Sequence, residues 1–120
     1  MIVDEPELHF GSDVLVPDIA GWRRQRLPSL PTDAYLTLAP DWIAEVLSPS
    51  TETLDRGKKL RIYARVGVAH AWLVDPLKHT LEVMSLDAGQ WTVLGSYEGE
   101  TGVRAAPFEA IALELGALWV

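Results

Sequence analysis

Two acidic residues of this sequence stand where a charge is costly. Glu45 interrupts the apolar run 42–47 (WIAEVL), and Asp18 lies within the mostly apolar run 14–20 (VLVPDIA). A carboxylate buried in a strand is destabilising unless it is paired, protonated or bound to a metal. If the two strands are neighbours, one Mg²⁺ between them relieves both, because Mg²⁺ takes one or two carboxylates with water and phosphate oxygens. We therefore expect Asp18 and Glu45 to share one side of a sheet and to hold Mg²⁺ or Mn²⁺.

Each carboxylate also has a purely structural interpretation. Glu45 is then satisfied by an arginine or by backbone amides. Asp18 then accepts backbone amides beside Pro17, a residue whose missing N–H suits a sheet edge or a bulge. The residues alone leave both interpretations open. A third acidic residue, Asp75, is followed by Pro76 at the end of a strand-like run, which is typical of a turn.

A lysine on the following helix is the third candidate for chemistry. The face predicted to pack on the sheet has i, i+3, i+4, i+7 spacing and contains Lys59, Ile62, Tyr63 and Val66. The stripe predicted to face solvent contains Lys58, Arg61 and Arg65. An ammonium group at Lys59 would orient a water molecule and stabilise charge developing on a phosphate in the transition state. The alternative is that Lys59 pairs with Asp55, four residues earlier.

Basic residues gather in the middle of an acidic chain. The formal net charge is −7, which argues against a general nucleic-acid coating protein. Between Arg23 and Arg65, however, eight basic residues outnumber five acidic ones. This excess permits a partner that carries phosphate, and the expected contacts are Arg23, Arg24 and Arg26. The alternative is a solvated helix face and a solvated loop.

The composition is that of one globular domain, residues 1–120. The chain has 120 residues, 48% of them apolar, and no cysteine, which excludes disulfides and thiolate metal sites. Its three histidines lack metal-ligand spacing. No apolar run approaches the roughly 20 residues of a membrane helix, and the N-terminus lacks the pattern of a signal peptide. We expect a cytoplasmic protein with no membrane partner.

The order of elements predicts an α/β (α+β) fold, a mixed β-sheet with a packed helix. Strands are expected at 8–10, 14–20, 42–47, 71–74, 80–86, 91–97 and 110–115. A long loop is expected over 23–41, and a helix over 53–66 is ended by Gly67. The chain opens directly into a strand-like stretch, with nothing to cover the other sheet face. We therefore expect the N-terminal element of the domain to be missing.

Several segments together resemble a known family. They are VPDIAGWRR (16–24), PDWIAEVLSPST (40–51), the D-x-x-x-K of 55–59, YARVGV (63–68) and AWLVDP (71–76). This chain resembles the Uma-two family of restriction endonucleases, part of the PD-(D/E)xK nuclease superfamily, across essentially its whole length. The resemblance implies a restriction-endonuclease-like mixed sheet flanked by helices. It also implies a divalent-metal site that cuts phosphodiesters.

The resemblance also assigns residues. The superfamily aspartate corresponds to Asp18 and the superfamily acid to Glu45. The usual lysine, two positions after that acid, is Leu47 here, and its role passes to Lys59 on the following helix. Family members usually begin with a helix and an opening strand that this chain lacks, and that helix often supplies a further glutamate near the metal.

The preferred function is therefore Mg²⁺-dependent cleavage of DNA. Asp18 and Glu45 would hold the metal, Lys59 would orient the attacking water, and Asp55 would position Lys59. One alternative is an inactive nuclease-fold remnant that acts as a binding or oligomerisation module. Another is a structural subunit that completes a partner's sheet. We also expect a homodimer or higher homo-oligomer, because without its opening element the sheet exposes apolar surface and an unpaired edge.

Overall fold

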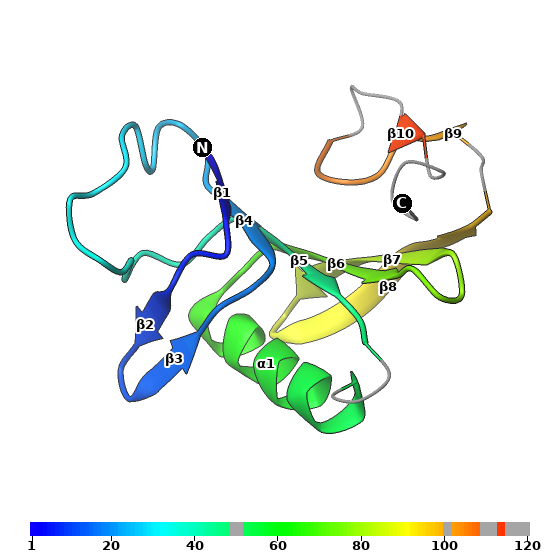
Figure 1. Ribbon diagram of the computed structural model, residues 1–120, viewed down its shortest axis with the longest axis horizontal. Coiled ribbons are helices and arrows are strands. Elements are labelled where there is room, and N and C mark those ends of the chain that lie inside the picture. Colours follow the sequence, from blue (N-terminus) through cyan, green and yellow to red (C-terminus); the bar gives the residue numbers. More distant parts are fainter. Residues whose placement is uncertain (49–51, 100–101, 109–112, 115–120) are drawn as a thin grey trace.

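The computed structural model describes residues 1–48, 52–99, 102–108 and 113–114. Of residues 52–56 and 113–114 only the backbone is described. The strands and the helix are labelled in Figure 1.

A six-stranded sheet organises the chain, in the order β1-β4-β5-β6-β7-β8. Its strands are β1 (Ile2–Asp4), β4 (Ile19–Gly21), β5 (Trp42–Val46), β6 (His70–Asp75), β7 (Thr80–Asp87) and β8 (Gln90–Glu98). The β5–β6 pair is parallel, and every other neighbouring pair in this sheet is antiparallel. The predicted mixed sheet of the α+β class is thus confirmed.

The helix α1 (Glu52–Val66) connects the two parallel strands, as a parallel pair requires. It ends at Gly67, which adopts a φ of 84°. The amide of Val68 donates to the carbonyl of Tyr63 over 3.0 Å, and the amide of Gly67 donates to that of Ala64 over 3.2 Å. These two bonds form a Schellman cap, which fixes the end of the helix where glycine allows a left-handed residue.

Alternation along the strands divides the side chains between two faces. The face toward α1 contains Ile43, Ala71, Leu73 and Met84, which belong to one core cluster with Ile62 and Tyr63 of the helix. The opposite face contains Trp42, Ala44, Trp72, Val74, Leu81 and Val83. Glu45 follows Ala44 in β5, so the alternation turns its side chain toward α1.

The face away from α1 is also covered near its centre. Phe108 packs edge-on against both Trp42 and Trp72, with ring centroids 5.0 Å and 5.7 Å apart. Figure 1 shows β9 (Gly102–Val103) and β10 (Leu113–Glu114) on this side of the sheet. The expectation that nothing covers this face is therefore wrong for these tryptophans. Of the predicted strand 110–115, the structure gives 113–114 as β10, and the other residues lie outside those described.

The predicted strand 14–20 is wrong as a single element. It is divided between β3 (Asp13–Leu15) and β4, and the intervening 16–18 segment has no strand structure. Pro17 lies there with its side chain fully buried, and its missing N–H removes a bond that a continuous ladder would need. β3 instead pairs with β2 (Leu8–Phe10) as a separate hairpin beside α1 (Figure 1).

The long segment between β4 and β5 is a loop, as predicted for 23–41. It is anchored by buried Leu27 and Leu36 and by the indole N–H of Trp22, which donates to the carbonyl of Leu38 over 2.9 Å. Among the described residues, no helix has the length and apolar character needed to cross a membrane.

Candidate functional site

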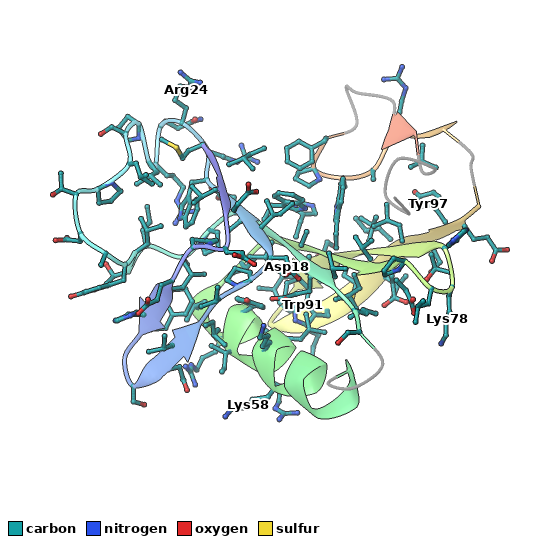
Figure 2. All side chains as sticks on the ribbon, viewed as in Figure 1. Asp18, Arg24, Lys58, Lys78, Trp91 and Tyr97 are labelled. Atoms are coloured by element: carbon teal, nitrogen blue, oxygen red, sulfur yellow. The ribbon has the colours of Figure 1, made fainter. Side chains whose placement is uncertain are left out.

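Asp18 and Glu45 come from adjacent antiparallel strands. Ile19 of β4 pairs with Ala44 of β5, so the register extended by one position places Asp18 across from Glu45. The Oδ2 atom of Asp18 accepts a hydrogen bond from the amide of Val46 over 2.6 Å. Burial is the main cause of the raised pKa of Glu45, and the negative charge of Asp18 adds to the rise. Figure 2 shows Asp18 near the centre of the molecule.

Glu45 is buried, with a residue exposure of 9%. Its two oxygens have different partners: Oε1 accepts a hydrogen bond from the hydroxyl of Tyr63 over 3.0 Å, and Oε2 lies 3.4 Å from Nζ of Lys59. Burial raises the pKa of the Glu45 carboxyl above its ordinary value, while the charge of Lys59 and the Tyr63 hydrogen bond oppose that rise. Glu45 is therefore a carboxylate held in place at an energetic cost, a pattern common at functional sites.

Lys59 extends from α1 to the edge of this carboxylate. Its Nζ lies 3.4 Å from Oε2 of Glu45 and 3.4 Å from the carbonyl oxygen of Val16. Both distances are near the limit for a hydrogen bond, so the ammonium is held loosely and can meet a further oxygen. Its side chain is 29% exposed, whereas Lys58 is exposed. The predicted helix face is confirmed, but the side chain of Asp55 lies outside those described.

Tyr63 also belongs to the site, through a polar contact that the sequence did not predict. We predicted it as a packing residue, and its ring is fully buried in the core. Its hydroxyl is nevertheless committed to Glu45, and burial beside that carboxylate raises the pKa of the phenol, so Tyr63 stays a donor. Tyr63 lies four residues after Lys59 on the same helix face, and this spacing could have indicated that the two side chains reach the same carboxylate.

The donor set at this site suits a hard divalent cation. Mg²⁺ is usually bound through one or two carboxylates and completes its shell with water or phosphate oxygens. Asp18 and Glu45 supply two such groups. Among the described residues, no cluster of three or more histidine, cysteine, aspartate or glutamate side chains forms a metal site. The two carboxylates match the number of acidic groups that Mg²⁺ usually takes from a protein.

Asp75 has a structural role. It is buried, and its Oδ1 accepts hydrogen bonds from the amides of Leu77 and Lys78 over 3.1 Å and 3.0 Å. This arrangement closes the turn after β6, as the Asp75-Pro76 pair predicts.

The three arginines predicted to contact phosphate lie away from Glu45. They follow the far end of β4, where Asp41 accepts a bond from the amide of Arg23 over 2.7 Å and one from the Arg26 guanidinium over 2.8 Å. Figure 2 shows Arg24 on the far side of the molecule from Lys58. The structure therefore does not bring this cluster to the carboxylates.

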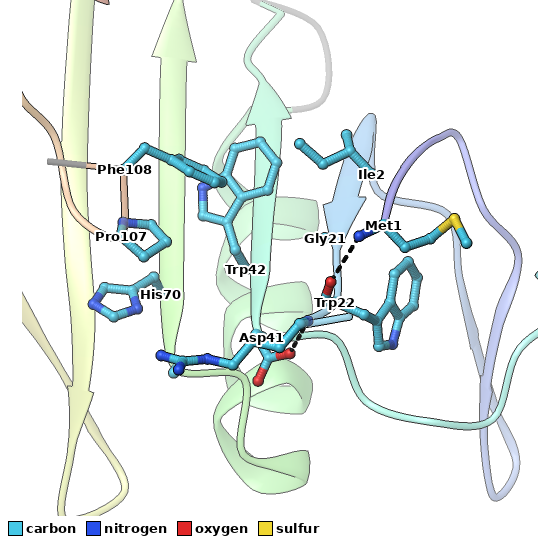
Figure 3. Close-up of a pocket in the computed structure, with 11 residues that line it drawn as sticks. Met1, Ile2, Gly21, Trp22, Asp41, Trp42, His70, Pro107 and Phe108 are labelled. Atoms are coloured by element: carbon cyan, nitrogen blue, oxygen red, sulfur yellow. Dashed lines mark hydrogen bonds between the residues drawn. The ribbon is translucent and has the colours of Figure 1, made fainter. Parts of the chain in front are cut away.

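A cavity of about 380 Å³ lies at this end of the sheet, where β5 and β6 begin (Figure 3). Trp42 and Phe108 form part of its wall, and Arg23, Asp41 and His70 also line it. Glu45 and Lys59 are not among its lining residues, so this cavity is separate from the carboxylate site.

The fold and the family of the chain are established by comparison with known proteins. A solved structure described as a putative nuclease belonging to DUF820, from Anabaena variabilis, superposes with a TM-score of 0.76 at 24% sequence identity. The match covers 98% of this chain and 66% of that one, and it shows a shared nuclease-like α+β fold. The chain belongs to the Uma2 family, described as "Putative restriction endonuclease", whose model matches residues 2–116. The comparison with curated proteins gave no match.

Proposed function

We propose that this protein is a metal-dependent endonuclease that hydrolyses phosphodiester bonds of DNA through a PD-(D/E)xK-like site. The observation that carries the proposal is the contact between Lys59 and the buried carboxylate of Glu45, beside Asp18. Membership of a family described as "Putative restriction endonuclease" supports DNA as the substrate. An ammonium group beside two carboxylates is a combination that can hold a divalent metal and stabilise charge on a phosphate.

Asp18 and Glu45 would hold Mg²⁺ or Mn²⁺ in this proposal. A bound Mg²⁺ would supply Lewis-acid stabilisation of the charge that develops on the phosphate. Tyr63 fixes Oε1 of Glu45 and thereby leaves Oε2 directed toward the Lys59 side. Lys59 is loosely held, so its ammonium is able to orient a water molecule and to bind a phosphate oxygen.

The proposed reaction is the addition of water across one ester bond. The water oxygen forms a bond to phosphorus, and the bond between phosphorus and one ester oxygen breaks. The leaving alkoxide takes up a proton, so the products are a phosphate monoester and a free hydroxyl. Lys59 would contribute mainly in the transition state, where negative charge on the phosphate oxygens is greatest.

Cleavage of supercoiled plasmid in Mg²⁺ or Mn²⁺ tests the proposal. We expect Glu45→Gln and Lys59→Met to lower the rate by roughly 100-fold or more, as for removal of a group that stabilises the transition state. Glu98→Gln and Lys78→Met are matched controls, because they remove an exposed carboxylate of β8 and an exposed ammonium of the β6–β7 turn. Both controls should cut like the unaltered protein. An unaltered protein that cuts no DNA, or a Glu45→Gln variant that cuts at full rate, would contradict the proposal.

A second function, that of an inactive nuclease-fold binding module, is favoured by one observation. Among the described residues, no third histidine, cysteine, aspartate or glutamate joins Asp18 and Glu45 to form a metal-binding group. Titration with Mn²⁺ by calorimetry separates the two functions. An active site should bind Mn²⁺ in a manner that Glu45→Gln abolishes, whereas a remnant should show no binding that depends on Glu45.

A further inference from the structure

We propose that the groove between the β2–β3 hairpin and α1 binds the sugar–phosphate backbone of the DNA strand next to the bond that is cut. The inference rests on the proposed nuclease function. The groove has a volume of about 360 Å³. Ser12, Asp13 and Leu15 line it from the hairpin, and Lys58, Lys59 and Ile62 line it from the helix.

The groove and the carboxylate site share one residue. Lys59 lines the groove, and its Nζ is also 3.4 Å from Oε2 of Glu45. A phosphate bound at Lys59 would therefore lie where the groove meets the acidic site. On one side of that phosphate, the DNA strand would continue along the groove.

The charge balance of the groove favours an anion. Among the described residues that line it, the one acidic residue is Asp13, which is paired with Arg65, whose Nη2 lies 2.6 Å from Oδ2. This pair neutralises Asp13 and ties the hairpin to α1. Lys58 is exposed and has no ion-pair partner within the described part of the chain. Lys59 is already paired with Glu45, so within the described residues Lys58 supplies the unpaired ammonium group of the groove.

A DNA strand bound at Lys59 would be held better by a second cation beside it. Phosphates along one strand recur about every 3.4 Å of helix axis, so a strand seated at Lys59 presents further negative charges beside it. Lys58, the next residue on the same helix, lines the same groove. The arginines after β4 are at the opposite end of the molecule, as Figure 2 shows for Arg24 and Lys58. The geometry therefore assigns the neighbouring phosphate to Lys58 and not to the arginines.

Salt-dependent binding of labelled duplex DNA in EDTA tests this groove. A lysine that contacts phosphate should reduce the slope of log affinity against log salt by about 1 when it is replaced. We expect that reduction for Lys58→Met, with unchanged slopes for Arg24→Met and for the control Lys78→Met. Circular dichroism should show the same folded state for all three variants. Single-turnover cleavage at saturating protein should be unchanged in the control Lys78→Met, which lies outside the groove.

The outcomes distinguish the groove from the function on which it rests. If the unaltered protein binds and cuts DNA but Lys58→Met leaves the slope unchanged, the groove is wrong and the nuclease assignment stands. A reduced slope in Arg24→Met alone would indicate that the DNA binds at the other end of the sheet, and it would contradict the proposed role of the groove. If the unaltered protein neither binds nor cuts DNA, the proposed function fails, and the groove fails with it.

Discussion

The hydroxyl of Tyr63 donates a hydrogen bond to Oε1 of Glu45 over 3.0 Å, and both residues are buried. The other oxygen of Glu45 faces Lys59 at 3.4 Å. The helix therefore holds one carboxylate by both oxygens, through a neutral donor and a cation that are one turn apart. This relationship makes Tyr63 a positioning residue in the proposed nuclease, because it acts on substrate only through Glu45.

Replacement of Tyr63 by Phe should weaken metal binding and also lower the stability of the fold. The change leaves Oε1 of Glu45 without its donor, which costs about 1–3 kcal/mol of stability. Groups that hydrogen-bond to metal ligands typically contribute 10–100-fold to metal affinity, so the Kd for Mn²⁺ should rise by that order. Calorimetric titration and thermal unfolding measure the two effects. Tyr97→Phe is the control, because it removes a hydroxyl from β8, and equal Mn²⁺ affinity in both variants would argue against the positioning role.

Glu45 should make the protein less stable as pH rises. Burial raises its pKa, so between the ordinary value of 4.5 and the raised value the folded chain binds more protons than the unfolded chain. Stability falls with pH wherever the folded state binds more protons, so the contribution of Glu45 declines through this window. Glutamine does not titrate. We therefore expect Glu45→Gln to be more stable than the unaltered protein at neutral pH and to lose that advantage in acid.

Urea unfolding in EDTA at a series of pH values measures this difference. Titrating groups that do not interact with Glu45 are common to the two proteins and cancel in the comparison. Glu98→Gln, which removes an exposed carboxylate, should follow the curve of the unaltered protein. A Glu45→Gln variant whose stability differs by a constant amount at every pH would show that Glu45 does not titrate in the folded state as proposed.

The β7–β8 hairpin should be stabilised by a single substitution in its turn. Ala88 and Gly89 connect Asp87 to Gln90, and both adopt positive φ, 49° and 78°. Such a turn favours Asn-Gly, since alanine is strained at positive φ. We expect Ala88→Asn to raise the free energy of unfolding by roughly 0.5–1 kcal/mol. Ala88→Val should lower it, because β-branched residues tolerate this conformation poorly; the opposite order in chemical denaturation would contradict the turn assignment.

Self-association through a sheet edge remains a prediction. Within the described residues, β1 and β8 are the two edges of the main sheet. Val93 and Leu94 of β8 are each 52% exposed, and an apolar edge strand is a template for pairing with a second copy. Sedimentation equilibrium should therefore show a dimer that Val93→Lys weakens. A monomer at high micromolar concentration would rule this association out.

The amino-acid sequence determined the local parts of this protein. Apolar runs broken by Ser-Pro and Asp-Pro predicted β5, β6 and the helix between them, and the family pattern predicted the nuclease-like fold. The 3.6-residue period also placed Lys59, and not Lys58, on the face toward Glu45. These predictions succeed because burial periodicity and chain breaks depend on residues close together in the sequence.

Only the tertiary structure decided how distant segments meet. The period predicts that Tyr63 is buried, but the use of its hydroxyl depends on the placement of Glu45, 18 residues earlier. The three arginines adjoin Asp18 in sequence, yet β4 runs between them and carries them to the other end of the sheet. Phe108 covers Trp42 through a contact across 66 residues. Such contacts depend on strand register and loop path, which long-range packing selects and which no local pattern contains.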